Sequence, residues 1–250
     1  GEHGVLAVRP AAKGNDLSLT LEGVSIGALF EVVQRTREMF DLDSPVDEIV
    51  ADLARDPRLE AALASLPGPR VPGAWDGFEL AVRAILGQQV SVAAATTLCG
   101  RIAARYGAPL TAGTPGSDSG LSVVFPTPER LARARLSGMG IVGQRVETIR
   151  SLARAVVDGQ VDFDLAQDPQ AFCAKLKTIR GIGDWTAEYV AMRVLKNPDA
   201  FPASDLGLRK AIGDRAAAPA RTLKDRAEAW RPWRAYAAML LWDSLPASGG

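Results

Sequence analysis

The stretch "LKTIRGIGDWTAEYVAM" at residues 176–192 places two glycines, Gly181 and Gly183, between an apolar, basic-flanked run and a segment of helical character. Glycine adopts backbone dihedrals that other residues avoid, and it lets another chain approach closely. Between two helices, Gly-Ile-Gly predicts a tight hairpin. Amides at the start of the second helix would then point outward and, with the helix dipole, favour an anion such as a DNA phosphate. An ordinary helix end and turn is the alternative, and "GIG" alone favours it.

The sequence around this hairpin predicts a mainly helical fold with a small α+β annex. The chain has 250 residues, 47% of them hydrophobic, enough for one large core or two smaller ones. Phe78, Val82, Ile85 and Leu86 have helical spacing, and Glu79 and Arg83 form an i,i+4 pair. Further helices are expected at about 91–105, after Thr127-Pro128, over 143–159, after Asp168-Pro169, and at about 185–197, 206–213, 222–230 and 233–243, with a polar loop over 112–120.

Residues 1–73 have a different pattern and are expected to form a separate N-terminal domain. Leu17, Leu19 and Leu21 alternate with polar residues after a Lys-Gly-Asn turn, which predicts a β-hairpin. One helix follows over 25–40. "GPRVPGAW" at 68–75 has the proline and glycine content of a linker. We therefore expect an incomplete hairpin-and-helix domain over 1–73 and a helical domain with an active-site cleft over 74–250.

The composition restricts the possible chemistry. Cys99 and Cys173 are too few for a disulfide framework or an iron–sulfur cluster, and both fall in apolar helical patterns. The single histidine is His3, so a general base must be a carboxylate, a tyrosine or a lysine. No run approaches the roughly 18 apolar residues of a membrane span, which favours a soluble, cytoplasmic protein. Residues 1–73 hold 7 basic against 12 acidic residues and residues 74–250 hold 22 against 17, so the larger part could meet a polyanion.

The hairpin and its surroundings resemble the helix-hairpin-helix (HhH-GPD) superfamily of DNA glycosylases. "FPASDLGLRKA" at 201–211 follows the hairpin at the distance where that superfamily keeps its catalytic aspartate. The segments at 75–98, 124–134 and 227–242 are similar to the 3-methyladenine DNA glycosylase II (AlkA) type. The resemblance implies a HhH-GPD fold over about 74–243, preceded by the latter part of a β-rich N-terminal domain. A fusion with an alkylation-response regulator of the Ada type is one explanation for the missing part.

The resemblance implies a role for specific residues. Asp205 would be the catalytic carboxylate, and it can also cap its helix. Trp185, Tyr189 and Trp242 match positions that line the base pocket, where electron-rich rings bind a cationic alkylated purine. Bifunctional members carry a lysine at the position of Trp185. The sequence therefore predicts a monofunctional enzyme of base excision repair that flips out 3-methyladenine or 7-methylguanine and leaves an intact abasic site.

Further parts of the site follow from the same resemblance. "LGQQVS" at 86–91 corresponds to a loop whose tip fills the gap left by the flipped base; the AlkA type has a leucine where this chain has Gln89. Gln88 is a further candidate for DNA contact, although a surface or cap role is its default interpretation. The hairpin residues Gly181, Gly183 and Asp184 are candidates for phosphate binding. Backbone carbonyls of Lys177, Ile179 and Ile182 would hold a monovalent cation, Na⁺ or K⁺.

Two other functions remain open at this point. A catalytically silent DNA-binding or regulatory module would also keep the hairpin, but would need neither Asp205 nor the aromatic residues. A glycosylase for another lesion, such as uracil or hypoxanthine, would keep both. The expected partner is damaged double-stranded DNA, bound by a monomer associated with the bacterial nucleoid and requiring no cofactor.

Overall fold

The computed structural model describes residues 4–110, 120–213 and 218–245, and the described chain begins with two antiparallel strands. β1 (Val5–Pro10) pairs with β2 (Leu17–Glu22) in a register that sets Val5 opposite Glu22 and Pro10 opposite Leu17. In β2 the leucines are half-buried and the residues between them are exposed. This alternation confirms the hairpin that the leucine spacing predicts.

Three helices follow the hairpin, where the sequence predicted one. Within the expected helix over 25–40, a short 3₁₀ turn η1 (Ile26–Ala28) leads into α1 (Leu29–Met39). The additional helices are α2 (Val46–Leu53) and α3 (Pro57–Leu63). Asp56 caps α3 by accepting a hydrogen bond from Arg58 N, and Pro57 occupies the first helical position, a start signal that sequence reasoning overlooked.

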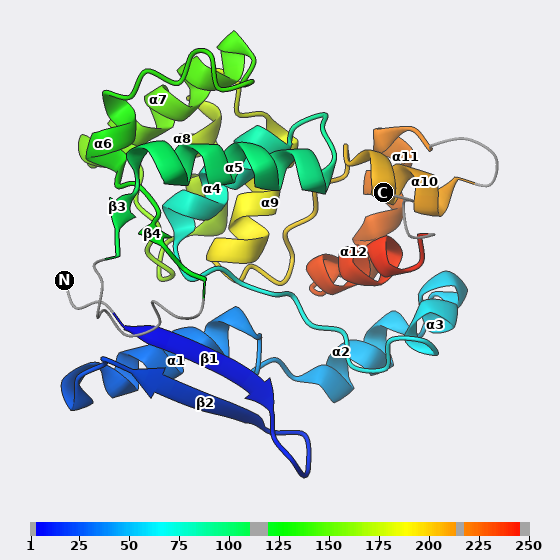
Figure 1. The fold of residues 1–250 in the computed structure, drawn as a ribbon. Coiled ribbons are helices and arrows are strands. Elements are labelled where there is room, and N and C mark those ends of the chain that lie inside the picture. Colours follow the sequence, from blue (N-terminus) through cyan, green and yellow to red (C-terminus); the bar gives the residue numbers. More distant parts are fainter. Residues whose placement is uncertain (1–3, 111–119, 214–217, 246–250) are drawn as a thin grey trace.

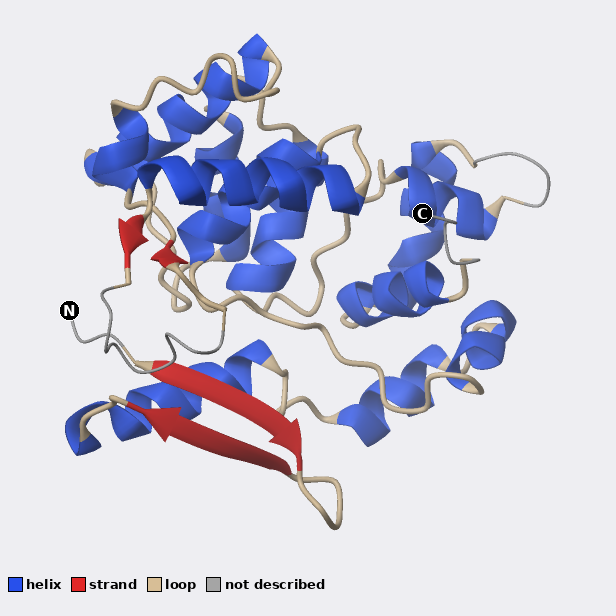
Figure 2. Ribbon diagram, viewed as in Figure 1, coloured by secondary structure: helices blue, strands red, loops and turns tan. Residues whose placement is uncertain are grey.

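The regular secondary structure of the remaining chain is almost entirely helical, as expected. Figure 1 shows two groups of helices, and Figure 2 shows that the strands are confined to the first hairpin and one short pair. The first group contains α4 (Gly77–Gly87), α5 (Val92–Tyr106), α6 (Pro128–Ala132), α7 (Gly143–Val157), α8 (Pro169–Lys177) and α9 (Asp184–Val194), with the strand pair β3 (Ala108–Pro109) and β4 (Val123–Val124). The second contains α10 (Leu206–Ile212), α11 (Ala220–Ala227), the 3₁₀ turn η3 (Glu228–Trp230) and α12 (Arg234–Asp243). Most of the expected loop over 112–120 lies outside the described residues.

The core forms around α4, which packs against α5, α7 and α9. The four apolar residues that predicted α4 are all buried, and Val82, Ile85 and Leu86 are completely so. Burial of a leucine or isoleucine side chain contributes about 1.5–3 kcal/mol. Cys99 and Cys173 are free and buried in this core, where burial raises the pKa of the Cys99 thiol to about 11 and that of the Cys173 thiol to about 12. No helix among the described residues is long and apolar enough to cross a membrane.

The expected linker over 68–75 has no regular structure over most of its length, but it is not a loose connection. Val71 is 3% exposed, and its backbone N–H donates to the buried carboxylate of Asp41 at 2.9 Å. Its carbonyl accepts a hydrogen bond of 2.8 Å from Lys196, just after α9. Pro72 O accepts from Arg193 of α9 at 2.9 Å. The segment thus ties the N-terminal elements to the helix that begins at the glycine hairpin.

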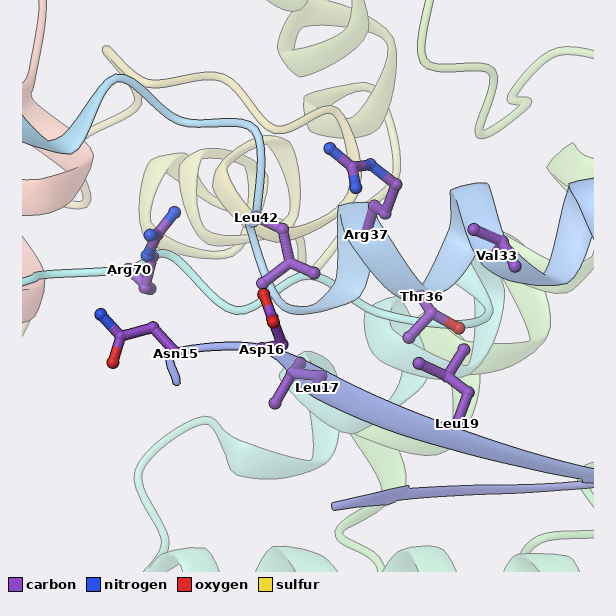
Figure 3. Close-up of a pocket in the computed structure, with 9 residues that line it drawn as sticks. All are labelled: Asn15, Asp16, Leu17, Leu19, Val33, Thr36, Arg37, Leu42 and Arg70. Atoms are coloured by element: carbon purple, nitrogen blue, oxygen red, sulfur yellow. The ribbon is translucent and has the colours of Figure 1, made fainter. Parts of the chain in front are cut away.

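A groove of about 500 Å³ lies between the β-hairpin and α1 (Figure 3). Its polar lining includes Asn15, Asp16, Arg37 and Arg70. Arg70 is engaged there by Ser44 Oγ at 2.8 Å, and Arg37 pairs with Asp43. None of the residues expected to act in catalysis lines this groove, so the site is to be found elsewhere.

Candidate active site

The Gly-Ile-Gly unit forms the predicted hairpin between α8 and α9. Gly181 has φ +95°, in the left-handed region that favours glycine. A Cβ on Gly181 would lie 2.0 Å from Oγ1 of Thr148. That hydroxyl donates to the carbonyl of Arg180 at 3.0 Å, so α7 supports the hairpin from behind. The fold itself therefore requires glycine at position 181.

Gly183 is different, because nothing in the described chain lies within 4 Å of the position its Cβ would take. Its backbone is extended, with φ −99° and ψ −175°, and it is the N-cap of α9. No side chain of the described residues caps the first turn of α9. The neighbouring Asp184 points its carboxylate at Lys177, 2.9 Å away, so its backbone amide is the part suited to an anion. This helix start has the open backbone and dipole that bind anions.

Asp205 is the N-cap of α10 and meets two indoles. Its Oδ1 accepts hydrogen bonds of 2.9 Å from Leu208 N and from Trp242 Nε1. Its Oδ2 accepts one of 2.8 Å from Trp185 Nε1. The sequence allowed a capping role and a chemical role for Asp205, and the cap is confirmed.

The three aromatic residues expected in the base pocket are in contact. The rings of Trp185 and Tyr189 stack with centroids 5.4 Å apart and an interplanar angle of 11°, as their i,i+4 spacing on α9 predicts. Trp242 of α12 meets Tyr189 edge-on at 6.4 Å and 66°. The guanidinium of Arg193, four residues beyond Tyr189, lies 5.3 Å from the centre of the tyrosine ring. The aromatic group therefore joins α9 to α12 beside the carboxylate of Asp205.

The loop between α4 and α5 reaches the hairpin through Gln88. Its Nε2 donates to Gly181 O at 3.0 Å and to Thr186 Oγ1 at 2.9 Å, so both amide protons are used within the protein. Gln89, the next residue, is exposed and has φ 57°. Of the two glutamines, Gln89 is the one whose side chain faces solvent.

Comparison with known proteins identifies the family. Residues 82–235 match the family described as HhH-GPD superfamily base excision DNA repair protein, and residues 1–76 match the AlkA N-terminal domain. The chain belongs to the HhH-GPD superfamily. The resemblance seen in the sequence and the expected fold class are thereby confirmed.

Relatives of this HhH-GPD protein cover nearly all of the chain. It is 34% identical over 246 residues to an Escherichia coli (strain K12) protein named DNA-3-methyladenine glycosylase 2, covering 97% of this chain and 82% of that protein. It is 38% identical over 245 residues to a Mycobacterium tuberculosis (strain H37Rv) protein named probable bifunctional transcriptional activator/DNA repair enzyme AlkA. That match covers 97% of this chain and 48% of the relative, so the chain spans about half of the relative's length.

Solved structures of HhH-GPD proteins share the fold. A 3-methyladenine DNA glycosylase from Archaeoglobus fulgidus has a TM-score of 0.77 at 22% identity, covering 96% of this chain and 81% of that one. The Schizosaccharomyces pombe enzyme Mag1, solved in complex with abasic DNA, has a TM-score of 0.66 at 22% identity, covering 78% and 95%. At this identity the similarity concerns the fold.

The HhH-GPD hairpin supplies the carbonyls that were expected to hold a cation. The side chains of Ile179 and Ile182 are buried, 7% and 5% exposed. The carbonyl of Ile179 accepts a hydrogen bond of 3.0 Å from Ile182 N and keeps its second lone pair. Carbonyl oxygens, here including that of Lys177, are ligands that hard cations accept. The donor type therefore fits Na⁺ or K⁺; the described residues contain no cluster of three or more His, Cys, Asp or Glu for another metal.

Sequence reasoning missed two residues that shape this candidate site. Gly207 is one: a Cβ there would lie 3.0 Å from Asp205 Oδ1 and 3.3 Å from Cδ1 of Trp242. Its missing side chain leaves room for the indole to reach the carboxylate. Glu188 is another, since its Oε2 accepts a hydrogen bond of 3.0 Å from Phe201 N and holds the segment that leads to Asp205. The glycine within "SDLGLRK" was the available sequence signal for Gly207. No sequence signal indicated the role of Glu188.

Proposed function

We propose that this chain is a monofunctional DNA glycosylase that removes alkylated purines, 3-methyladenine and 7-methylguanine, from duplex DNA and leaves an abasic site. The observation that carries the proposal is the carboxylate of Asp205, whose oxygens accept hydrogen bonds from the indoles of Trp185 and Trp242. A negative charge and a set of electron-rich rings thus lie together at one place. The family and the names of the relatives support the same reaction class.

The hairpin would hold the DNA backbone. The uncapped first turn of α9 offers amide donors at the positive end of a helix of 11 residues. A phosphate placed there would meet the backbone of Gly183 without hindrance from a side chain. A monovalent cation on the carbonyls of Lys177, Ile179 and Ile182 would add positive charge to the same contact. A monomer would be sufficient for these DNA contacts. It would act in the cytoplasm, where chromosomal DNA lies.

The flipped base would stack on the aromatic group. A flat base between two rings needs about 7 Å between them, twice the contact distance of two carbon atoms. The rings of Trp185 and Tyr189, 5.4 Å apart, leave no such space, so they act as one platform. Arg193 follows Tyr189 by four residues, as Tyr189 follows Trp185, so its guanidinium covers the other side of the Tyr189 ring. The stacking surface for the base would therefore be the face of Trp185 turned away from Tyr189, worth about 0.5–2 kcal/mol for a cationic base.

Asp205 would act on the sugar. Cleavage of the N-glycosidic bond develops positive charge on the deoxyribose, and a nearby carboxylate stabilises that charge. Each carboxylate oxygen has two lone pairs. Oδ1 accepts two hydrogen bonds and Oδ2 accepts one, so Oδ2 keeps a lone pair for the sugar or for the proton of the attacking water. The Trp185 contact would thus orient the oxygen that reacts.

The absence of an amine at position 185 supports the monofunctional reaction. A bifunctional enzyme forms a Schiff base between a lysine amine and the sugar. The indole of Trp185 has no nucleophilic amine, and its N–H is committed to Asp205. Water is therefore the expected nucleophile, and the DNA strand would stay intact.

The test uses methylated duplex DNA with the wild type, Asp205→Asn and the matched control Asp168→Asn. Asp168 caps α8 through Ala171 N as Asp205 caps α10 through Leu208 N, so the control makes the same change at a cap outside the site. Asparagine is an equally good N-cap, so both variants keep the hydrogen bond that begins their helix. Released bases are separated by chromatography, and strand integrity is measured on gels before and after alkali.

The expected result is release of 3-methyladenine and 7-methylguanine by the wild type and the control, loss of release by Asp205→Asn, and strands cut by alkali alone. Release of uracil or hypoxanthine from defined duplexes, without release of methylated purines, would assign another lesion. DNA binding without release of any base would replace the proposal with a silent DNA-binding module.

A further inference from the structure

The loop that carries Gln89 is a tight turn, and the strained backbone conformation in this turn is that of Gln89. Gln88 has φ −59° and ψ 120°, Gln89 has φ 57°, and Val90 N donates to Gly87 O at 3.4 Å. These values match a type II β-turn, whose third residue is usually glycine because its φ is positive. Glutamine is disfavoured in this conformation, so the surrounding contacts must hold it there. Such strain in an exposed loop points to a purpose for the side chain.

Gln88 links the turn to the hairpin, to α9 and to α7. Its side-chain amide binds the hairpin at Gly181 O and the first turns of α9 at Thr186 Oγ1. Its backbone carbonyl accepts a hydrogen bond from the guanidinium of Arg145 in α7. Thr186 is 2% exposed, so this anchor is buried in the protein. The residue before the strained position is thereby fixed at both its backbone and its side chain.

We propose that Gln88 is a positioning residue that couples the hairpin to the exposed Gln89, so that phosphate binding and filling of the base gap occur in one fixed register. The inference rests on the proposed function. The carbonyl that Gln88 binds belongs to Gly181, within the hairpin that would hold the phosphate. Any DNA seated on that hairpin therefore meets Gln89 at a set distance and orientation. Gln88 acts through Gln89, because its own amide protons are already used.

The experiment compares Gln88→Met with wild type on methylated DNA in duplex and in single-stranded form. Methionine keeps the length of the side chain and removes both hydrogen bonds. Gln170→Met is the matched control, since Gln170 is exposed on α8 outside the site. Thr186→Val removes the acceptor at the other end of one contact. Unstacking is followed separately by fluorescence of 2-aminopurine opposite an abasic-site analogue.

We expect Gln88→Met to lower excision from duplex DNA by about tenfold, the effect of losing hydrogen bonds of this kind. Excision from single strands should stay within about twofold, because no stacked partner has to be replaced there. Thr186→Val should show the same difference between duplex and single-stranded DNA, but a smaller one. The control Gln170→Met should show no such difference. Equal losses on both substrates would reduce Gln88 to a structural role, and unchanged duplex rates would remove the coupling.

The two proposals fail in different ways. If the wild type excises nothing from either substrate, the proposed function fails. The 2-aminopurine signal then still decides the coupling: a smaller signal for Gln88→Met than for Gln170→Met at saturating protein supports it, and equal signals overturn it.

Discussion

The indole Nε1 of Trp185 donates a hydrogen bond of 2.8 Å to Oδ2 of Asp205, which lies twenty residues further along the chain. One residue thus contributes both a stacking surface and a donor to the carboxylate. The two contributions can be separated, because phenylalanine keeps an aromatic ring and lacks the N–H.

Trp185→Phe should lower kcat by about 10- to 100-fold with a smaller change in KM, as expected for losing a hydrogen bond to a charged group. Trp242→Phe should cost less, because Oδ1 keeps the hydrogen bond from Leu208 N when the indole of Trp242 is removed. Single-turnover kinetics on methylated duplex DNA measure both effects. An unchanged kcat in both variants would show that the two indoles matter as rings alone.

The two hairpin glycines should respond differently to alanine. Gly181→Ala meets a left-handed φ, which costs about 1–2 kcal/mol, and a clash with Thr148. It should strongly lower the free energy of unfolding. Gly183→Ala meets open space and should cost roughly 0.5–1 kcal/mol as a poorer N-cap, while lowering DNA affinity by about tenfold through the methyl group.

Urea denaturation and fluorescence anisotropy with duplex DNA separate the two effects on this hairpin. A Gly183→Ala variant with full DNA affinity would contradict the phosphate contact at the start of α9.

Local signals in the sequence predicted parts of the candidate site, and the family resemblance supplied the roles of its residues. Asp205 was identifiable from its segment and its distance from the hairpin, and the stack of Trp185 on Tyr189 follows from i,i+4 spacing. Helix starts such as Asp168-Pro169 were equally local. The stack and the helix starts depend on residues within about one or two helical turns of each other, which is the range over which sequence periodicity carries information.

Other features could not be predicted because they join distant parts of the chain. The hydrogen bond from Gln88 to Thr186 spans 98 positions, and Trp233 of the last helices donates to Asp52 across 181. No periodicity encodes such pairs. The second contact also explains why α2 was missed. This short helix packs beside the C-terminal helices, and its own sequence gives no signal of that tertiary contact.

Acid should loosen the contact between α3 and the C-terminal helices. Burial by itself would raise the pKa of Asp56, but hydrogen bonds from Arg58 N, Trp230 and Arg226, together with the charge of Arg226, hold it below its ordinary value. A carboxyl group with a lowered folded-state pKa stabilises the protein above its unfolded pKa, and this stability is lost as pH falls through the folded pKa. Asp56→Asn should therefore destabilise the protein at pH 7. It should also flatten the acid limb of the stability curve, which is the fall in the free energy of unfolding below about pH 4.

Urea denaturation of the wild type and Asp56→Asn between pH 2.5 and 7 measures this difference. Parallel stability curves across that range would rule out the linkage. Asp225→Asn, at an exposed carboxylate of α11, is the control and should leave the acid limb unchanged.

Asp41 and Lys196 form a joint between the N-terminal elements and the segment after α9, and replacing one of them should cost more stability than replacing the other. Asp41 is 7% exposed and accepts hydrogen bonds of 2.9 Å from Val71 N and Tyr236, beside Lys196 Nζ at 3.2 Å. Asp41→Ala leaves Lys196 half-buried without its counter-charge and should cost about 3–5 kcal/mol. Lys196→Met should cost less, because Asp41 keeps its hydrogen bonds from Val71 N and Tyr236, and methionine removes the desolvation penalty that lowers the pKa of Lys196.

The pH dependence gives a second test of this joint. A lysine whose folded pKa is lowered binds protons more weakly in the folded state, so stability rises with pH between the folded and unfolded pKa values. Without Asp41 the pKa of Lys196 should fall further, because its counter-charge is gone. Part of the loss in Asp41→Ala should therefore be recovered between pH 7 and 9.5. Urea denaturation at both pH values decides it, and a constant difference from wild type would contradict a buried charge at this joint.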